Sequence, residues 1–502
     1  MTDSISFPEF QQIRDILKIP VGFDPSVQRE AEALADRDLS SLPNQQEIPF
    51  ITIDPPTSRD LDQAFFATRQ GEKYVVKYAI ADVGFFVERG SVIEEEAWRR
   101  GLTMYSPDLK TPLYPAILSE GAASLLPQVA RPAIVFSFRL NTRAEVESFT
   151  LERTVIRSYA KLAYPDVSLH LDAEREITNS GSLAGNSWSE SLTLLEEIGR
   201  KREQLEAERG GVSLRIPAQQ VERWSTALHG YRLAFEEASA VEGWNAQISL
   251  MTGMAAAQLM IERGVGLLRA LEVPRPERVQ MLRLTAHALQ ISWPDEMTYP
   301  EFVRSLDPKQ PLHAVMLHQA ARVTGGARYV AFEGEGQAWH SAIAAPYAHV
   351  TAPLRRLADR YVLDLLVELT NGHRPSQELM ATLYQLPPVM SEADRLSRQL
   401  ESAIVDFAEA RLMQDRAGEI FNAMVIGLRQ EGVVVQVTEP PLRTLIPITV
   451  WRAQGEEAKL ASDGATLMVG EQRLTLGETV SLRLEAANPK ARSLSFSLVQ
   501  AA

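Results

Sequence analysis

The 502-residue sequence contains no cysteine, so disulfide bonds and thiolate metal sites are excluded. It also lacks any apolar run near the ~18 residues that a membrane-spanning helix requires. Its first residues, MTDSISFPEFQQIRD, include acids and lack the apolar core of a secretory signal. These absences together favour a cytoplasmic protein with no membrane partner.

Positive charge is also scarce. Lys and Arg number 51 against 65 Asp and Glu, which gives a formal net charge of −14. A protein that coats nucleic acid along a broad surface is normally basic, so this class is disfavoured. An enzyme with a local basic channel remains compatible with the acidity, because the local potential guides a substrate.

The hydrophobic pattern divides the chain into three regions. Residues 1–46 are polar with apolar side chains at helical spacing, which predicts one or two short helices. Residues 47–414 mix strand-like alternation with long helical patterns, the latter at residues 187–211, 244–264, 353–372 and 391–418. Residues 415–502 hold about five short strands between turn residues, which predicts an OB-type β-barrel. We therefore expect a multidomain α+β protein.

Three aspartates follow an apolar run in the segment ITIDPPTSRDLDQA. Asp54 ends the run, two prolines keep the backbone open, and Asp60 and Asp62 follow. In an extended segment residues 60 and 62 point the same way, so the three carboxylates can converge. Such oxygen ligands suit Mg²⁺, and two such ions can activate a water and stabilise the leaving oxygen of a phosphodiester. The alternative is a solvated acidic turn.

A second motif, YAHVTAPLRRLAD, sets two arginines beside a proline. Pro353 suits the first turn of a helix and Thr351 its cap, so the motif predicts Arg355 and Arg356 in that first turn. Arginines there oppose the helix dipole, and phosphate is the natural anion to compensate. The alternative is an ion pair between Arg355 and Asp359.

Three further residues stand out singly. Tyr105 lies in a loop punctuated by prolines, LTMYSPDLKTPLYP, where an aromatic ring can stack on a base or simply pack. Glu401 lies within an expected helix, where a solvated position is the default interpretation. His349 is interpreted as a hydrogen-bonded structural residue rather than a ligand or base.

Together these blocks resemble the ribonuclease II / ribonuclease R family of exoribonucleases from about residue 47 onward. ITIDPPTSRDLDQA is similar to the family's metal-site signature, and YAHVTAPLRRLAD to its Y-x-x-x-T-S-P-I-R-[KR]-Y-x-D block. RLSRQLESAIVDFAEARLMQDRAG resembles the helix that leads out of the catalytic domain. The barrel from residue 419 resembles an RNA-binding domain of the ribosomal-protein S-one type. Several blocks in order are far more specific than one motif.

The resemblance implies hydrolytic degradation of RNA from its 3′ end to nucleoside 5′-monophosphates, with two Mg²⁺ ions or Mn²⁺ in their place. It implies a monomer that binds the 3′ end of single-stranded RNA, or of a tailed duplex. The implied catalytic residues are Asp62 and Arg355. The implied metal ligands are Asp54, Asp60, Asp62 and Gln63. The implied RNA contacts are Tyr105, Thr351, Arg355, Arg356 and Glu401.

The sequence departs from the family pattern at several positions. Gln63 stands where an aspartate is common, and an amide oxygen is a weaker ligand for a hard cation. Ala352 and Leu357 replace the usual serine and tyrosine. Residues 1–46 are too few to form the two cold-shock domains that relatives carry, so we expect that pair to be absent and the RNA entrance to be less enclosed. Two alternatives stay open: an RNA-binding member with little or no nuclease activity, and a phosphodiesterase that also acts on DNA.

Overall fold

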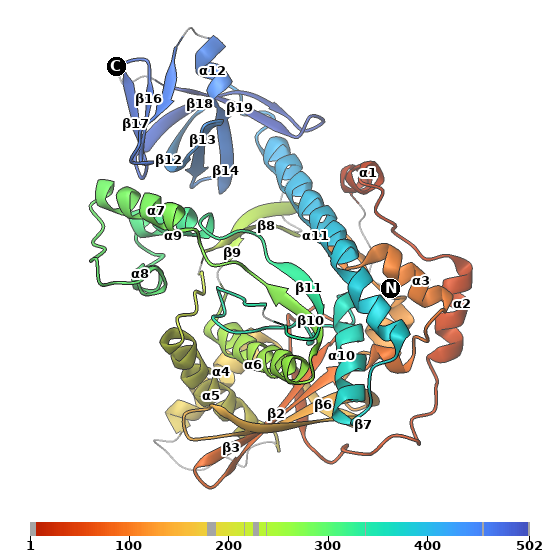
Figure 1. Cartoon of the computed structure of the whole chain (residues 1–502). Helices are drawn as coiled ribbons and strands as arrows, with labels where there is room; N and C mark the ends of the chain where they lie inside the picture. The colour runs from red at the N-terminus through yellow and green to blue at the C-terminus, as the bar shows by residue number, and fades with distance from the viewer. Residues whose placement is uncertain are drawn as a thin grey trace.

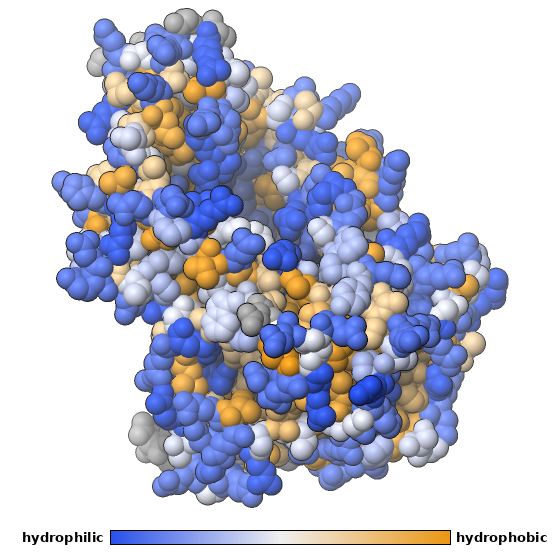
Figure 2. Space-filling model, viewed as in Figure 1, coloured by the Kyte–Doolittle hydropathy of each residue, from blue (hydrophilic) through white to orange (hydrophobic). Residues whose placement is uncertain are grey.

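The computed structural model describes residues 7–177, 187–214, 216–223, 230–236, 238–336, 338–453 and 456–499. A closed β-barrel covered by helices lies at one end and a second five-stranded sheet at the other (Figure 1). Figure 2 shows a mostly hydrophilic face, hollowed between the C-terminal sheet and the rest of the molecule. In the described ranges no helix combines the length and apolarity needed to cross a membrane. The expected α+β class with a second barrel-like sheet is confirmed.

The first barrel forms from strands whose buried residues alternate or run continuously. Its strands, in barrel order, are β1 (Phe50–Ile53), β2 (Gln63–Gln70), β3 (Lys73–Ala81), β6 (Ala130–Leu140) and β7 (Val146–Leu162). Neighbours pair antiparallel except β1 and β7, whose parallel pairing closes the barrel. Closure leaves no free sheet edge, so the barrel is a rigid support for the segments that connect its strands.

Long helices cover the barrel. They are α4 (Tyr164–Ile177), α5 (Ser189–Glu208), α6 (Ala240–Glu262) and α10 (Leu357–Thr370). The helix α6 is apolar on most of its surface and largely buried, which agrees with the helical pattern at residues 244–264. It approaches α5 so closely that a Cβ on Gly199 would lie 2.4 Å from Cβ of Trp244. Only glycine permits this contact at position 199.

The motif with two arginines does not begin a helix at Pro353, so the prediction of arginines in a first helical turn is wrong. Helix α10 starts at Leu357, and Arg356 before it is extended, with φ −132° and ψ 120°. The cause is pairing with another segment: the amide of Thr103 donates to Arg355 O at 3.0 Å, and that of Leu357 to Gly101 O at 3.0 Å. These long-range hydrogen bonds replace the first helical turn.

The helix expected at residues 391–418 begins earlier and ends earlier than predicted. Helix α11 (Gln377–Leu412) begins at the cap Ser376, whose side chain accepts from the Leu379 amide. It continues through Pro387 and Pro388 because the buried side chains around them, such as Leu386, pack against the core. Helix α11 joins the covered barrel to the C-terminal sheet (Figure 1).

The C-terminal sheet is antiparallel and nearly closed. Its order is β14 (Leu442–Pro447), β13 (Gly432–Val437), β12 (Ile420–Leu428), β18 (Thr479–Asn488) and β19 (Ser493–Leu498). Its buried apolar residues form a core with α7, α9 and the end of α11. A three-stranded sheet lies beside it, made of β15 (Ala458–Leu460), β16 (Thr466–Val469) and β17 (Gln472–Thr475).

Shorter elements connect these parts. The N-terminal region holds α1 (Pro8–Ile16) and α2 (Pro25–Leu34), as its helical spacing predicts. The remaining helices are η1 (Val83–Phe85), α3 (Val92–Arg100), η2 (Leu118–Ala122), α7 (Pro276–Ala288), α8 (Tyr299–Ser305), α9 (Pro311–Ala321) and α12 (Ile448–Ala453). The remaining strands are the pairs β4 (Met104–Tyr105) with β5 (Lys110–Thr111), β8 (Ala218–Arg223) with β9 (Tyr231–Glu236), and β10 (Val265–Ala270) with β11 (Arg328–Glu333).

Candidate active site

The three aspartates lie on the segment that connects β1 to β2. Asp54 directly follows β1, and Asp60 and Asp62 come just before β2. The two strands pair antiparallel, so both ends of the connection are held at the same end of the barrel. Lys161 on β7 donates to the carbonyl of Pro56 at 2.8 Å, and Ser124 Oγ accepts from the amide of Leu61 at 2.9 Å. The fold therefore fixes the acidic segment at several points.

Asp62 is buried and bound by the segment that carries the arginines. The amide of Leu354 donates to its Oδ1 at 2.8 Å, and Arg355 Nε lies 3.4 Å from its Oδ2. Burial raises the pKa of Asp62 to about 7, although Arg355 and the Leu354 amide oppose that rise. Residues almost 300 positions apart thus meet at one carboxylate.

Asp60 is engaged by the β4–β5 hairpin. Lys110 Nζ lies 3.0 Å from its Oδ1, and the Tyr105 hydroxyl donates to its Oδ2 at 3.3 Å. Lys110 also pairs with Glu120. The Tyr105 residue remains 49% exposed, so its ring is open to solvent beside the acids. Burial of the hydroxyl and the nearby Asp60 raise the pKa of Tyr105.

Asp54 completes the acidic group. Burial, and then the neighbouring Asp60, raise its pKa to about 6, while Arg355 and Lys161 lower it. Asp60 also raises the pKa of Asp62. Asp60 therefore lies within range of the charge of both other carboxylates, and Arg355 acts on Asp54 and Asp62.

Gln63 links the acidic segment to the arginine-bearing segment. Its Nε2 donates to the backbone carbonyl of Thr351. A carbonyl can only accept, so the amide nitrogen must face it, and Oε1 is the end left for another partner. The Thr351 side chain is buried, and its hydroxyl lies 2.7 Å from Ser249 Oγ on α6. An RNA contact through Thr351 stays a prediction.

The two arginines have different surroundings. Arg356 binds Asp359 through Nε at 3.2 Å and Nη2 at 2.8 Å, and its guanidinium is largely enclosed. The alternative pair of Arg355 with Asp359 is therefore not formed. The Arg355 side chain is 44% exposed and pairs with Asp62. Arg355 is thus the arginine with room to meet an anion, and an RNA contact by Arg356 stays a prediction.

Glu401 and His349 form no hydrogen bond with the aspartates among the described residues, and an RNA contact by Glu401 stays a prediction. Glu401 is exposed on α11. His349 Nδ1 lies 2.7 Å from the Tyr329 hydroxyl, and burial holds its pKa well below the usual value. The hydrogen bond and the burial agree with the structural interpretation of His349.

The sequence analysis did not identify three groups that hold residues of the candidate site in place. Lys110 pairs with Asp60, the Leu354 amide binds Asp62, and Ser249 holds Thr351. Lys110 stands five residues after Tyr105, and a β-hairpin pattern there was the one available signal. Ser249 and the Leu354 amide carry no sequence signal, because long-range folding alone brings them to the site.

The donor set fits a hard divalent cation. Within the described ranges no three His, Cys, Asp or Glu side chains already form a metal-binding group. Lys110 and Arg355 hold the carboxylates instead. Mg²⁺ usually retains waters and needs only one or two carboxylates plus substrate phosphates, so a complete protein cage is not required. Asp54, Asp60 and Asp62 are the residues that would hold such an ion.

The RNB domain family model matches residues 37–372, more than half of the chain. Ribonuclease R of Escherichia coli (strain K12) is 23% identical over 477 residues, which are 90% of this chain. Exoribonuclease 2 of Photorhabdus laumondii is 24% identical and covers 93% of this chain. The chain spans 57% of the length of the first relative and 73% of the second.

Solved structures share the fold. Mycoplasma genitalium RNase R, in complex with ribose-methylated single-stranded RNA, superposes with a TM-score of 0.84 at 18% identity, covering 98% of this chain and 77% of its own. Yeast Ssd1, described as a pseudonuclease, has a TM-score of 0.68 at 15% identity, covering 94% of this chain and 59% of its own. The acid-bearing barrel, the shared fold and the match over residues 37–372 agree, and the chain belongs to the RNB domain family.

Proposed function

We propose that this protein is a hydrolytic 3′→5′ exoribonuclease that releases nucleoside 5′-monophosphates. The observation that carries the proposal is the meeting of Asp54, Asp60 and Asp62 with Arg355, which comes from a distant part of the chain. Acids beside a half-exposed arginine suit the cleavage of a phosphodiester. The named exoribonucleases among its relatives support the same reaction.

Each side chain has a proposed task. Asp54, Asp60 and Asp62, with Gln63 Oε1, hold one or two Mg²⁺ ions, or Mn²⁺. When bound, such ions supply charge for the phosphoryl oxygens and lower the pKa of water. Arg355 leaves Asp62 and binds the scissile phosphate, where its guanidinium stabilises the charge that develops. The exposed ring of Tyr105 stacks on the 3′-terminal base.

Release of the arginine is the step that this arrangement requires. A contact of 3.4 Å between Arg355 Nε and Asp62 Oδ2 is long for a charge-assisted hydrogen bond. The arginine side chain is nearly half exposed, whereas Asp62 keeps its backbone hydrogen bond to Leu354. Arg355 can therefore turn to an incoming phosphate while the carboxylate stays in place.

The test uses a single-stranded adenosine oligoribonucleotide, labelled at either end, with purified protein and Mg²⁺. The 5′-labelled strand should shorten stepwise, and the 3′-labelled strand should release labelled nucleoside 5′-monophosphate first. Asp62→Asn should abolish shortening, because asparagine keeps the acceptor for the Leu354 amide and loses the charge. Asp36→Asn, at an exposed aspartate, is the matched control.

The outcomes separate the alternatives. Equal shortening by the wild type and Asp62→Asn would mean a contaminating nuclease. Binding of the RNA without shortening would favour the RNA-binding member with little activity. The ion pairs of Lys110 with Asp60 and of Arg355 with Asp62 motivate this alternative, because they occupy two of the carboxylates. Equal shortening of a deoxyadenosine oligomer would favour the phosphodiesterase that also acts on DNA.

A further inference from the structure

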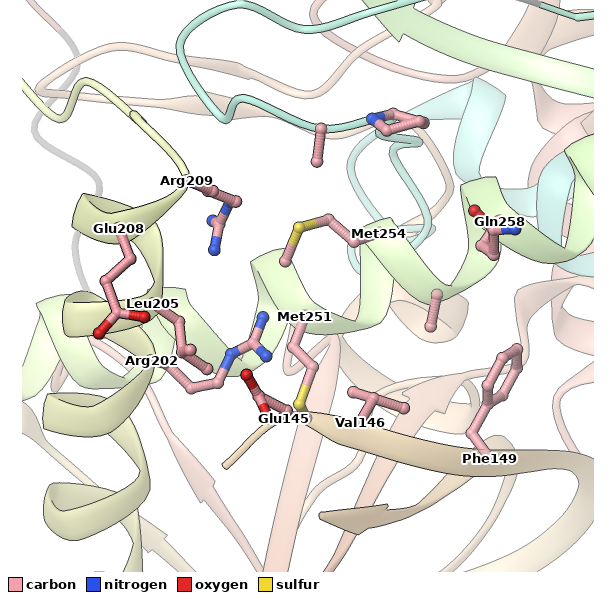
Figure 3. Close-up of a pocket in the computed structure, with 13 residues that line it drawn as sticks. Glu145, Val146, Phe149, Arg202, Leu205, Glu208, Arg209, Met251, Met254 and Gln258 are labelled. Carbon is pink, nitrogen blue, oxygen red and sulfur yellow. The ribbon is translucent and has the colours of Figure 1, made fainter. Parts of the chain in front are cut away.

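A cavity of about 630 Å³ lies between α5, α6 and the start of β7 (Figure 3). Its volume is in the range of about 300–1,000 Å³ that small-molecule sites occupy. Arg202 on α5 and Arg209, the residue directly after α5, form one wall, and Met251 and Met254 from α6 form another. The cavity therefore combines positive charge with an apolar surface.

Both arginines have N–H groups without a partner. Arg202 is 5% exposed and donates through Nη1 to Ala144 O at 3.2 Å, but its Nε is buried and unpaired. Arg209 donates through Nε to Ile343 O at 2.8 Å, and its Nη2 is buried and unpaired. Among the described residues neither arginine has an ion-pair partner within 4.0 Å, since the salt bridges found there involve other side chains.

Nearby carboxylates offset only part of this charge: Glu206 raises the pKa of both arginines, but its oxygens already accept hydrogen bonds from Ser213 and Gln247. Burial and, after it, the neighbouring Arg209 lower the pKa of Arg202 to about 10. Glu145 and Glu208 also line the cavity, but Arg143 lies 3.8 Å from Glu145 and pairs with Glu208. An unpaired buried N–H is unfavourable, and two like charges add repulsion, so an anion between the guanidiniums would relieve both.

The facing wall suits an apolar or flat group. Met254 and Phe149 present methyl, sulfur and ring surfaces to the cavity, and the buried Met251 borders it on the same side. Methionine adapts its shape readily and makes favourable contacts with aromatic rings. In Figure 3 the guanidiniums of Arg202 and Arg209 point toward the space that Met251 and Met254 border. A ligand can thus place its anionic end and its apolar part on different walls.

The cavity is separate from the candidate active site. Helix α6 contributes Ser249 to the contact with Thr351, whereas Met251 and Met254 line the cavity. Residues 249 and 251 are about 200° apart around a helix with 3.6 residues per turn, so α6 lies between the two sites.

We propose that this cavity is a binding site for a small organic anion of the size of a nucleoside monophosphate. The anionic group lies between Arg202 and Arg209, and the apolar or aromatic part lies against Met254 and Phe149, close to the buried Met251. The proposal concerns binding alone and does not rest on the proposed nuclease function.

The test is a titration of the full-length, metal-free protein labelled with ¹³C at the methionine methyl groups. The probes are adenosine 5′-monophosphate, inorganic phosphate and adenosine. Met251→Leu and Met254→Leu identify the two resonances of the cavity. The monophosphate should shift both, with saturation in the micromolar to millimolar range and affinity at least about tenfold higher than that of phosphate. Adenosine, which lacks the anion, should leave both unshifted.

Variants separate this site from other sites. Arg202→Gln and Arg209→Gln should each lower the affinity for the monophosphate about tenfold or more. If Arg202→Gln does not fold, the Arg209→Gln variant alone tests the proposal, because Arg209 is the less buried of the two. Arg200→Gln, an exposed arginine of the same helix paired with Glu196, should titrate as the wild type does. Asp62→Asn should also leave the shifts unchanged.

Three results would overturn the proposal. One is the absence of any shift of the Met251 and Met254 resonances at millimolar monophosphate. A second is an unchanged titration in a folded Arg209→Gln protein. The third is equal affinity for the monophosphate and for adenosine, or for the monophosphate and phosphate, because the site needs both the anion and the organic part.

Discussion

Asp62 makes the stability of the metal-free protein depend on pH in a direction opposite to that of an ordinary salt-bridged aspartate. Burial raises its pKa from 3.8 to about 7, so the folded chain holds a proton that the unfolded chain has released. This contribution to the free energy of unfolding is fully present at low pH, and it is lost as pH rises through the folded-state pKa. The perturbation that removes it is Asp62→Asn.

The magnitude follows from the two pKa values. Each pKa unit is worth about 1.4 kcal/mol, so the full difference corresponds to about 4 kcal/mol, and the part lost between about pH 6 and pH 8 is about 1 kcal/mol. If the RNB domain, residues 37–372, unfolds as one unit, this corresponds to a change in Tm of about 1–2 °C. The wild type should lose this increment on going to the higher pH, and Asp62→Asn should not.

The assay is differential scanning calorimetry with a metal chelator at both pH values. Asp36→Asn reports the pH dependence that arises from the general negative charge, and it should follow the wild type. Excess Mg²⁺ should raise the Tm of the wild type more at the higher pH, because a metal ion binds the deprotonated carboxylate. An equal change in Tm with pH for wild type and Asp62→Asn would refute the assignment of the raised pKa to Asp62.

Three further predictions concern side chains around the acids. Arg355→Lys should lower kcat about 100-fold with a small change in KM, measured by steady-state RNA degradation, because lysine cannot bind phosphate bidentately. Tyr105→Ala should weaken RNA binding by about 1–3 kcal/mol in a fluorescence titration, whereas Tyr105→Phe should bind normally, since the ring does the stacking. Gln63→Glu should lower the Mg²⁺ concentration for half-maximal activity, and lower Tm by breaking the hydrogen bond to Thr351. An unchanged Mg²⁺ requirement would contradict a ligand role for Gln63.

Local sequence patterns predicted much of the fold. Strand alternation, helical spacing and turn residues predicted the α+β class, the C-terminal barrel-like sheet and the helices near residues 187–211 and 244–264. They placed the start of α10 wrongly, because Thr103 and Gly101 pair with the backbone on either side of Arg356. They also missed the first part of α11, residues 377–390, where burial of Leu386 and its neighbours keeps the helix continuous through two prolines.

The sequence by itself determined which chemical groups are present: closely spaced carboxylates, two arginines, a tyrosine in a loop punctuated by prolines and no thiol. It also determined the family resemblance, because ordered motifs persist along the chain. Only the tertiary structure decided how these groups pair. Arg355 rather than Arg356 reaches Asp62, Lys110 holds Asp60, and Gln63 binds the Thr351 carbonyl. The cavity beside Arg202 and Arg209 likewise arises where two helices and a strand meet. Contacts of this kind depend on burial and on closure of the barrel over hundreds of residues, and spacing along the chain does not encode them locally.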